Sequence, residues 1–435
     1  MEQIISYKRI GALAFPIIIS QSIVLLDGMI DLAFIGPLGT DAIAAVAIAN
    51  AICATVFNFL EGFRIGTTVL IAKASANKDP AKGAGVINTG LFLTTLIGVV
   101  LIIFASDIST IVYDSIGNEQ IKYHGVAYLK VWLWTVPLIL FSYVLVGLFR
   151  GLRDTVTPLF STVASCILNA IFTYLFVYGG WGFPSLGVEG SAWGTFAANL
   201  VGLLIIIYLV IKNPLTTQYI RWNHSFLKQA PEYVSLAIDI GLNTGFTLLA
   251  LLAFVYVIKP LGSVALAVHQ ITLQIFNLAY LPSIGFLITA SILVPRLVEQ
   301  ETNHLLKPTV NRICRMSLGV ICLTSGTLFL SASAVSRFFS PADAIVAEQA
   351  TQTLKLVCCG QLFSSVYMVL RGALTGCRDT RFIIYEGLLS SYLIFLPLAY
   401  LFAIQLGYGV YGGYMAFLLW CMTDCLALAF RFYRQ

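Results

Sequence analysis

The sequence predicts an all-α integral membrane protein with twelve transmembrane helices in two pseudo-symmetric six-helix lobes. Composition, long apolar stretches and an internal repeat support this fold class. Of the 435 residues, 59% are hydrophobic and only 10% are charged, whereas soluble domains carry about 25% charged residues. A soluble fold could not keep so much apolar surface out of water. We therefore expect the lipid bilayer to surround most of the chain.

The apolar stretches continue for more than twenty residues without alternating polar positions, which indicates spanning helices rather than the strands of a barrel. The expected helices cover residues 10–36, 42–72, 84–106, 122–149, 157–178 and 188–212, and then residues 233–258, 264–296, 311–338, 348–372, 383–406 and 409–432. The predicted domains are an N-terminal lobe at 1–213, a cytoplasmic linker at 214–232 and a C-terminal lobe at 233–435. The first apolar stretch lacks a cleavage site, so it is expected to be a retained helix.

Basic residues fall mainly on one side of this twelve-helix arrangement. Of the 25 Lys and Arg residues, Arg64 lies inside a span and nineteen lie at the two chain ends and the even-numbered connections. Five lie on the opposite side: Lys122, Lys130, Lys259, Arg337 and Lys355. Because cytoplasmic loops retain positive charge, both termini are expected to face the cytoplasm. An incorrect number of helices would have mixed the two groups.

The two halves repeat each other. Gly-Leu-Arg-Asp-Thr at 151–155 recurs as Gly-Cys-Arg-Asp-Thr at 376–380, and Gly62-Phe63 recurs as Gly285-Phe286. Further matches begin at Pro37 and Pro260 and at Gly187 and Gly409, all in the same order and at nearly constant offset. Each half has an even number of spans, so the copies should be related by an axis along the membrane normal. Transporters with such parallel repeats are a known architecture, and a duplicated channel subunit is the less favoured alternative.

The first expected helix carries Asp27 and Asp31, four residues apart and thus on one helix face. Ionisable groups inside a membrane span are costly and are functional candidates by default. Two carboxylates this close cannot both ionise cheaply in a poorly solvated site, so they should titrate as a coupled pair suited to cation exchange. The alternative is that one of them is simply hydrated at the outer mouth. Pro16 in the same helix is expected to bend it.

Other polar residues inside spans have structural interpretations. Glu61 and Arg64 are three residues apart and can form an ion pair on one helix face. Glu386 and Asp424 have no evident local partner, and a bond to a neighbouring helix is favoured over a coupling role. His269 is expected to be buried and hydrogen-bonded. Nine scattered cysteines and four histidines lack zinc-ligand spacing, so neither a metal site nor a cofactor is expected.

Several stretches resemble the multidrug and toxic compound extrusion family over nearly the whole chain. They are Ile-Asp-Leu-Ala-Phe-Ile-Gly at 30–36, Arg-Ile-Gly-Thr-Thr at 64–68, Arg-Gly-Leu-Arg-Asp-Thr at 150–155 and Gly-Val-Glu-Gly-Ser-Ala-Trp-Gly-Thr at 187–195. His269-Gln270 and the motif at 378–380 also fit. The sequence is most similar to the DNA-damage-inducible protein F branch, whose members are generally proton-coupled.

The resemblance implies a bending role for Pro16 and a cation-coupling set in the first lobe: Asp31, Asp27, Asn169, Thr173, Thr195 and Tyr128. Asp31 matches the acidic residue of the first helix, whereas Thr173 stands where the family often has an aspartate. Thr247 is the best match to a glutamate in the seventh helix of another branch, so the sodium site of that branch is expected to be absent. In the repeat, the position of the second half that corresponds to Asp31 is Phe254. The second half thus lacks a matching acid, so coupling is expected mainly in the N-terminal lobe.

The resemblance implies a secondary active exporter of small organic cations or amphipathic drugs, driven by inward flow of protons or, alternatively, sodium, with alternating access. It also implies a monomer in the bacterial inner membrane, with no nucleic-acid partner. A lipid-linked precursor flippase of the same superfamily is the alternative, and it needs basic grooves for pyrophosphate. The expectation that buried positive charge is essentially limited to Arg64 argues against it. The chain shows no catalytic motif, so it is not expected to be an enzyme.

Overall fold

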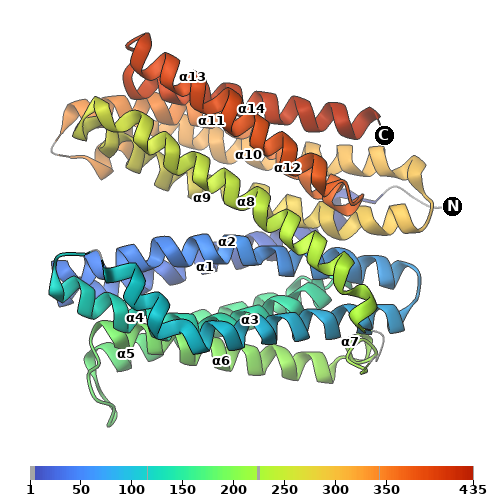
Figure 1. Ribbon diagram of the computed structural model, residues 1–435. Helices are drawn as coiled ribbons and strands as arrows, with labels where there is room; N and C mark the ends of the chain where they lie inside the picture. Colours follow the sequence, from blue (N-terminus) through green and yellow to red (C-terminus); the bar gives the residue numbers. More distant parts are fainter. Residues whose placement is uncertain (1–4, 115, 223–225, 342, 435) are drawn as a thin grey trace. The chain divides into compact units, whose positions relative to one another are not determined.

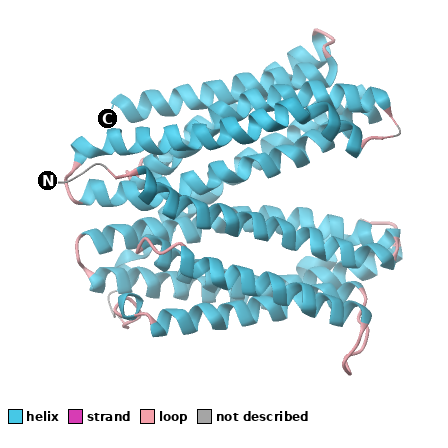
Figure 2. Ribbon diagram, turned by 180° about the vertical axis from the view of Figure 1, so that it is seen from behind, coloured by secondary structure: helices cyan, strands magenta, loops and turns pink. Residues whose placement is uncertain are grey.

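The computed structural model describes residues 5–114, 116–222, 226–341 and 343–434. These residues form long helices joined by short loops (Figures 1 and 2), with one isolated bridge between Gly180 and Phe183. The first half contains α1 (Tyr7–Ile35), η1 (Gly36–Leu38), α2 (Thr40–Ala76), α3 (Pro80–Asp114), α4 (Glu119–Gly151), α5 (Val156–Tyr178), α6 (Val188–Lys212), α7 (Pro214–Thr217) and η2 (Phe226–Gln229). The second half contains α8 (Ala230–Ile258), η3 (Lys259–Leu261), α9 (Ser263–Glu299), α10 (Asn303–Phe339), α11 (Ala344–Gly376), α12 (Thr380–Leu389), η4 (Ser390–Phe395), α13 (Leu396–Tyr400), η5 (Leu401–Gln405) and α14 (Gly409–Arg434).

Within the described residues, 12 helical stretches are long and apolar enough to cross a membrane, which confirms the predicted number of spans. The eleventh, Thr380–Gln405, is not one uniform α-helix as the sequence suggested. It alternates between α-helix and the π-helical segments η4 and η5. Because π-helical turns are rare and occur often at functional sites, this span differs from its neighbours in a way that local propensity did not indicate.

The chain divides into two compact units. One is Ile19–Ile238, and the other combines Met1–Ile18 with Asp239–Gln435. The division therefore falls inside α1 and α8, whereas the sequence placed the domain boundaries on either side of a linker at 214–232. That stretch contains α7 and η2, and its residues 223–225 lie outside the described residues.

Both units have the same internal order of helix contacts. In the first, α4 packs against α2, α3 and α6; in the second, α11 packs against α9, α10 and α14. Corresponding loops also repeat unusual backbone angles. Arg153 and Arg378 have φ values of 68° and 66°, and Lys78 and Glu301 have φ values of 52° and 56°. Positive φ is uncommon for residues other than glycine, so its recurrence at matching positions supports the internal duplication.

Two equivalent glycines allow close approach of helix backbones. A Cβ atom on Gly62 of α2 would lie 2.1 Å from the carbonyl oxygen of Ala237 in α8. In the other unit, a Cβ atom on Gly285 of α9 would lie 2.4 Å from Cγ1 of Ile18 in α1. Small residues are typical where helices in a membrane pack closely. The glycine of the repeated Gly-Phe motif thus admits a neighbouring helix in each unit, against backbone in the first and against a side chain in the second.

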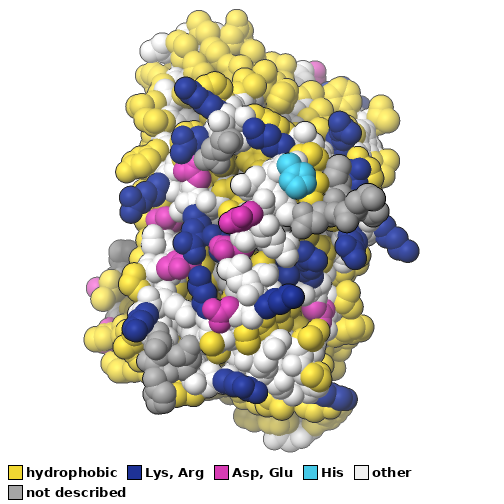
Figure 3. All heavy atoms as spheres, turned by 90° about the vertical axis from the view of Figure 1, so that its right-hand side faces the viewer, with side chains coloured by type: hydrophobic (Ala, Val, Ile, Leu, Met, Phe, Trp, Pro, Cys, Tyr) yellow, Lys and Arg dark blue, Asp and Glu magenta, His cyan; other side chains and the backbone are white. Residues whose placement is uncertain are grey.

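Basic side chains are both exposed and buried in this protein. Figure 3 shows the face on the right-hand side of Figure 1, where many Lys and Arg side chains lie among hydrophobic ones. Other basic side chains are buried, since Lys73, Arg150 and Arg296 are only 3%, 3% and 8% exposed. The expectation that buried positive charge is essentially Arg64 is therefore wrong. These residues lie in the last turns of long helices and fold back into their units rather than extending into loops.

Candidate functional site

Asp31 lies in the penultimate turn of α1, and its side chain is buried against α5 and α6. Its Oδ1 atom accepts hydrogen bonds from Asn169 Nδ2 at 3.1 Å and from Thr173 Oγ1 at 3.2 Å. Its Oδ2 atom accepts one from Thr195 Oγ1 at 3.4 Å. Three neutral donors from two helices therefore surround this carboxylate.

Asp27 belongs to the same cluster. Asn169 Nδ2 also donates to Asp27 Oδ1 at 3.0 Å, so one amide group bridges the two carboxylates. The thiol of Cys166, one turn earlier in α5, contacts Asp27 as well. Among the described residues, neither carboxylate has a Lys or Arg in an ion pair with it. A site with two acids and only neutral donors is suited to bind a proton or another small cation.

The structure brings together five of the six residues predicted for cation coupling: Asp27, Asp31, Asn169, Thr173 and Thr195. The sixth, Tyr128, is buried in α4, and its hydroxyl donates to Asn50 Oδ1 of α2 at 3.4 Å. Sequence reasoning missed Asn50 and Cys166. Asn50 is a polar residue within an apolar stretch, which is the signal that could have drawn attention to it.

Pro16 lies inside α1, as the sequence predicted, and the helix continues on both sides of it. Proline has no backbone N–H group, so α1 lacks one of its regular hydrogen bonds at this point. The division between the two units falls two residues later, after Ile18. The helix that carries the acidic pair is therefore weakened close to the boundary between units.

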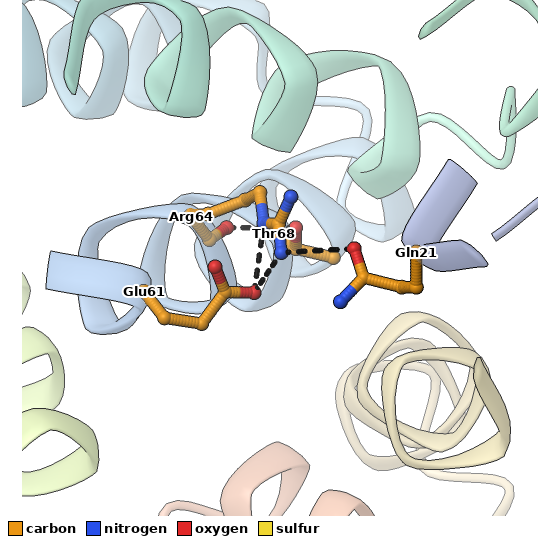
Figure 4. Close-up of polar contacts among 4 residues, drawn as sticks. All are labelled: Gln21, Glu61, Arg64 and Thr68. Atoms are coloured by element: carbon orange, nitrogen blue, oxygen red, sulfur yellow. Dashed lines mark hydrogen bonds and ion pairs between the residues drawn. The ribbon is translucent and has the colours of Figure 1, made fainter. Parts of the chain in front are cut away.

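Glu61 and Arg64 form the predicted ion pair on α2 (Figure 4). Arg64 Nε donates to Glu61 Oε1 at 2.7 Å, and Arg64 Nη2 donates to Gln21 Oε1 of α1 at 3.5 Å. The guanidinium group also lies 4.8 Å from the ring centroid of Tyr143 in α4. These contacts join three helices of one unit, as expected for a structural ion pair.

Glu61→Gln should lower thermal stability, because it leaves the buried guanidinium of Arg64 without its carboxylate. We expect a loss of up to about 3 kcal/mol, the lower end for a broken buried pair, since the Glu61 side chain is 22% exposed. The double variant Glu61→Gln/Arg64→Gln should recover part of this loss. Thermal unfolding in detergent measures both. A single variant that unfolds at the parent temperature would contradict the structural role.

Other polar residues form contacts between helices. His269 Nδ1 and the Tyr414 hydroxyl are hydrogen-bonded at 2.9 Å, which confirms the expected buried, bonded histidine. Thr380 Oγ1 donates to Asp239 Oδ2 at 2.5 Å. Glu386 and Asp424, which had no evident partner in the sequence, lie against each other across α12 and α14.

A separate cavity of about 510 Å³ lies in the first unit near the α3–α4 connection. Its lining includes Lys122, Lys130, Trp134, Glu189 and Trp193, and it includes none of the acidic-pair residues. Among the described residues, no group of three or more His, Cys, Asp or Glu side chains could hold a metal ion. The acidic pair with its neutral donors is therefore the candidate functional site.

Comparison with known proteins identifies relatives of the whole chain. The family model described as MatE matches residues 16–175 and 240–401. A probable multidrug resistance protein NorM of Photorhabdus laumondii is 25% identical over 404 residues, covering 91% of this chain and 88% of the relative. A multidrug resistance protein MdtK of Edwardsiella ictaluri is also 25% identical, with 98% and 94% covered.

Solved structures share the fold. One described as the outward-facing conformation of a multidrug resistance MATE family transporter of the MOP superfamily gives a TM-score of 0.87 at 18% identity, covering 98% of this chain and 95% of the other. A MOP superfamily transporter from Pyrococcus furiosus, described as having a binding pocket of reverse polarity, gives a TM-score of 0.84 at 17% identity with the same coverage. These likenesses establish the twelve-helix, two-lobe architecture.

Proposed function

The chain belongs to the MatE family, and from this premise we propose that it is a multidrug efflux transporter that exchanges organic cations or amphipathic drugs for an inward-moving cation. Its assignment among multi-pass membrane transporters excludes the enzyme class. The exchange itself is supported by the chemistry of the Asp27–Asp31 site. The two units with equivalent helix order are consistent with alternating access, in which two lobes expose a site to each side in turn.

The single observation that carries the proposal is the position of Asp31. The carboxylate is 9% exposed and accepts hydrogen bonds from Asn169, Thr173 and Thr195, and no basic residue in the described part of the chain forms an ion pair with it. A buried carboxylate of this kind gains most from binding a cation. The same helix contains Pro16, where α1 can bend. Cation binding shifts α1 between a bent and a straighter conformation only if these two conformations bind the cation with unequal affinity.

We propose the proton as the coupling ion, with sodium as the alternative. Neutral hydroxyl and amide donors already occupy the oxygens of Asp31. A proton added to one carboxyl oxygen needs no new ligands, whereas sodium would need several oxygen atoms directed at it. Asn169 Oδ1 and the threonine hydroxyls are the oxygens from which such a shell would have to be built.

The test is uptake of a fluorescent organic cation into inverted membrane vesicles that contain the protein. A proton gradient, acidic inside, should drive uptake, and a protonophore should abolish it. A sodium gradient imposed without a proton gradient separates the two ions. Uptake that is indifferent to both gradients would overturn the antiport proposal.

We propose that both termini face the cytoplasm, on the basis of the distribution of basic residues. Cysteine introduced at Gly117, in the α3–α4 connection, should react with a membrane-impermeant maleimide added to intact cells. Cysteine at Arg221, in the stretch after α7, should react only after the cells are permeabilised. Both positions are exposed, so accessibility to solvent is matched. The reverse pattern of labelling would invert the proposed topology.

A lipid-linked precursor flippase is the second candidate, because Lys73, Arg150 and Arg296 add buried positive charge to that of Arg64. Basic residues of this kind pair with pyrophosphate groups. The positions of these three in the last turns of helices favour a structural role instead. Transfer of a lipid pyrophosphate across the vesicle membrane, without uptake of the fluorescent organic cation, would favour the flippase.

A further inference from the structure

The C-terminal unit contains an acidic pair of its own. Glu386 lies in the second turn of α12, Asp424 lies in α14, and the two carboxyl groups are within hydrogen-bonding reach of each other. Their side chains are well shielded, since the residues are only 7% and 6% exposed. Because neither residue aligns with Asp27 or Asp31 in the repeat, the pair is not a copy of the first site.

If both carboxyl groups are ionised, most of their oxygen atoms lack a hydrogen-bond donor. Both Oε atoms of Glu386 and the Oδ1 atom of Asp424 are buried and accept no hydrogen bond from any donor among the described residues. The remaining side of Asp424 is contacted by the hydroxyl of Ser390. Buried carboxylate oxygens that face each other without a donor are strongly destabilising. A single proton removes the conflict, because one carboxyl O–H then donates to the other carboxylate.

The balance of charge around the pair also indicates one bound proton. Arg371 of α11 lies close enough to interact electrostatically with both Glu386 and Asp424. Its Nη2 atom donates to Thr244 Oγ1 of α8 at 3.0 Å, and it forms no ion pair with either acid among the described residues. One arginine can balance one negative charge. Two ionised carboxylates would leave one negative charge uncompensated, whereas one proton makes the three groups neutral together.

The helices around the pair hold it in place. Asn243 of α8 donates from Nδ2 to the carbonyl oxygen of Ile383, one turn before Glu386. Its Oδ1 atom is buried and accepts no hydrogen bond from the residues that the structure describes. Ser390, which contacts Asp424, also accepts a hydrogen bond from Trp420 Nε1 at 3.1 Å and begins the π-helical segment η4. A rare helical turn thus starts beside the acidic pair.

We propose that Glu386 and Asp424 form a second proton-binding site, in the C-terminal unit, where one proton is held between the two carboxyl groups. Tyr280 of α9, Tyr367 and Arg371 of α11, and Cys421 and Cys425 of α14 interact electrostatically with one or both acids. Near the start of α12, Asp239 of α8 accepts a hydrogen bond from Thr380, and Arg431 of α14 pairs with Asp379. Protonation makes the bound form neutral with Arg371, and loss of the proton leaves one unbalanced negative charge. Proton binding is thereby not confined to the N-terminal lobe.

The experiment measures the proton directly, by the infrared carbonyl stretch of a buried carboxylic acid. The parent is the full-length Asp27→Asn/Asp31→Asn variant, which removes the signal of the first pair. We expect one carboxylic-acid band that shifts in D₂O and disappears reversibly at alkaline pH. Glu386→Gln and Asp424→Asn should each abolish the whole band, because the new amide donates to the remaining carboxylate.

Asp239→Asn is the matched control, since Asp239 belongs to the same unit and already accepts a hydrogen bond from Thr380. It should leave the band unchanged. Absence of the band from the parent would overturn the proposal. This measurement leaves Glu386 and Asp424 unchanged, so its result does not depend on whether the Glu386 and Asp424 variants fold. Loss of only half of the band in each single variant would mean two independent protons, and displacement of the band by sodium would mean a sodium site.

The readout is proton binding and not drug export, so it does not depend on the proposed function. Failure of the antiport assay would leave this proposal standing. Conversely, a missing band would leave the Asp31 site unaffected.

Discussion

Asp31→Asn should abolish gradient-driven efflux, down to the rate of vesicles that lack the protein, while leaving insertion and folding intact. Asparagine has nearly the shape of a protonated aspartate but cannot release a proton. Its side-chain oxygen can still accept from Asn169 or Thr173, so the local packing should persist. The site would then remain permanently in the cation-loaded charge state, and a gradient would have nothing to act on.

Asp27→Asn should have a smaller effect. Asp27 receives one of the two hydrogen bonds from the Asn169 amide but none from Thr173 or Thr195. Removing its charge changes the electrostatic coupling within the pair, so we expect a lower rate and a displaced pH optimum of efflux rather than complete loss.

Dye efflux in vesicles over a range of pH, at matched protein amounts, measures both variants. Asp107→Asn, which changes an exposed carboxylate of α3, is the matched control and should retain the parent rate. If Asp31→Asn transports at the parent rate with an unchanged pH profile, the coupling site lies elsewhere. The Glu386–Asp424 pair would then be the first place to look.

Gly62→Ala should cause a large loss of stability for a change of one methyl group. The added Cβ would lie 2.1 Å from the carbonyl oxygen of Ala237, which is backbone and cannot move without shifting α2 or α8. Overpacking of this kind typically costs about 1–3 kcal/mol, and a clash with backbone places it at the upper end. Gly285→Ala should be milder, because its nearest contact is a side-chain atom, Cγ1 of Ile18, and the nearest backbone atom, the carbonyl oxygen of Ala14, is 3.3 Å away.

Gly319→Ala in α10 supplies the control, because a Cβ at that position would meet no atom within 4 Å. It should be neutral or stabilising by about 0.5–1 kcal/mol, since alanine is the better helix former. Thermal unfolding followed by size-exclusion chromatography in detergent compares the three. Equal unfolding temperatures for Gly62→Ala and Gly319→Ala would show that α2 and α8 do not approach as closely as described.

Features that depend on local pattern could be predicted from the sequence. Apolar length gave the twelve spans, and motif recurrence gave the two equivalent halves, now matched by the paired φ values of Arg153 and Arg378. The Glu61–Arg64 pair followed from helical spacing, because residues three apart share a face. The choice of Asn169 as a partner of Asp31 came from family resemblance and not from spacing.

Which faces of distant helices meet is seen only in the folded protein. Glu386 and Asp424 lie on α12 and α14, and nothing in either segment shows that the two carboxyl groups face each other. How helices rotate and cross also determines three other features. These are the burial of Arg150, the contact between Tyr128 and Asn50, and the division of α1 after Ile18. In a membrane nearly every face of a span is apolar, so periodicity does not specify that rotation, and side-chain packing between helices has to fix it.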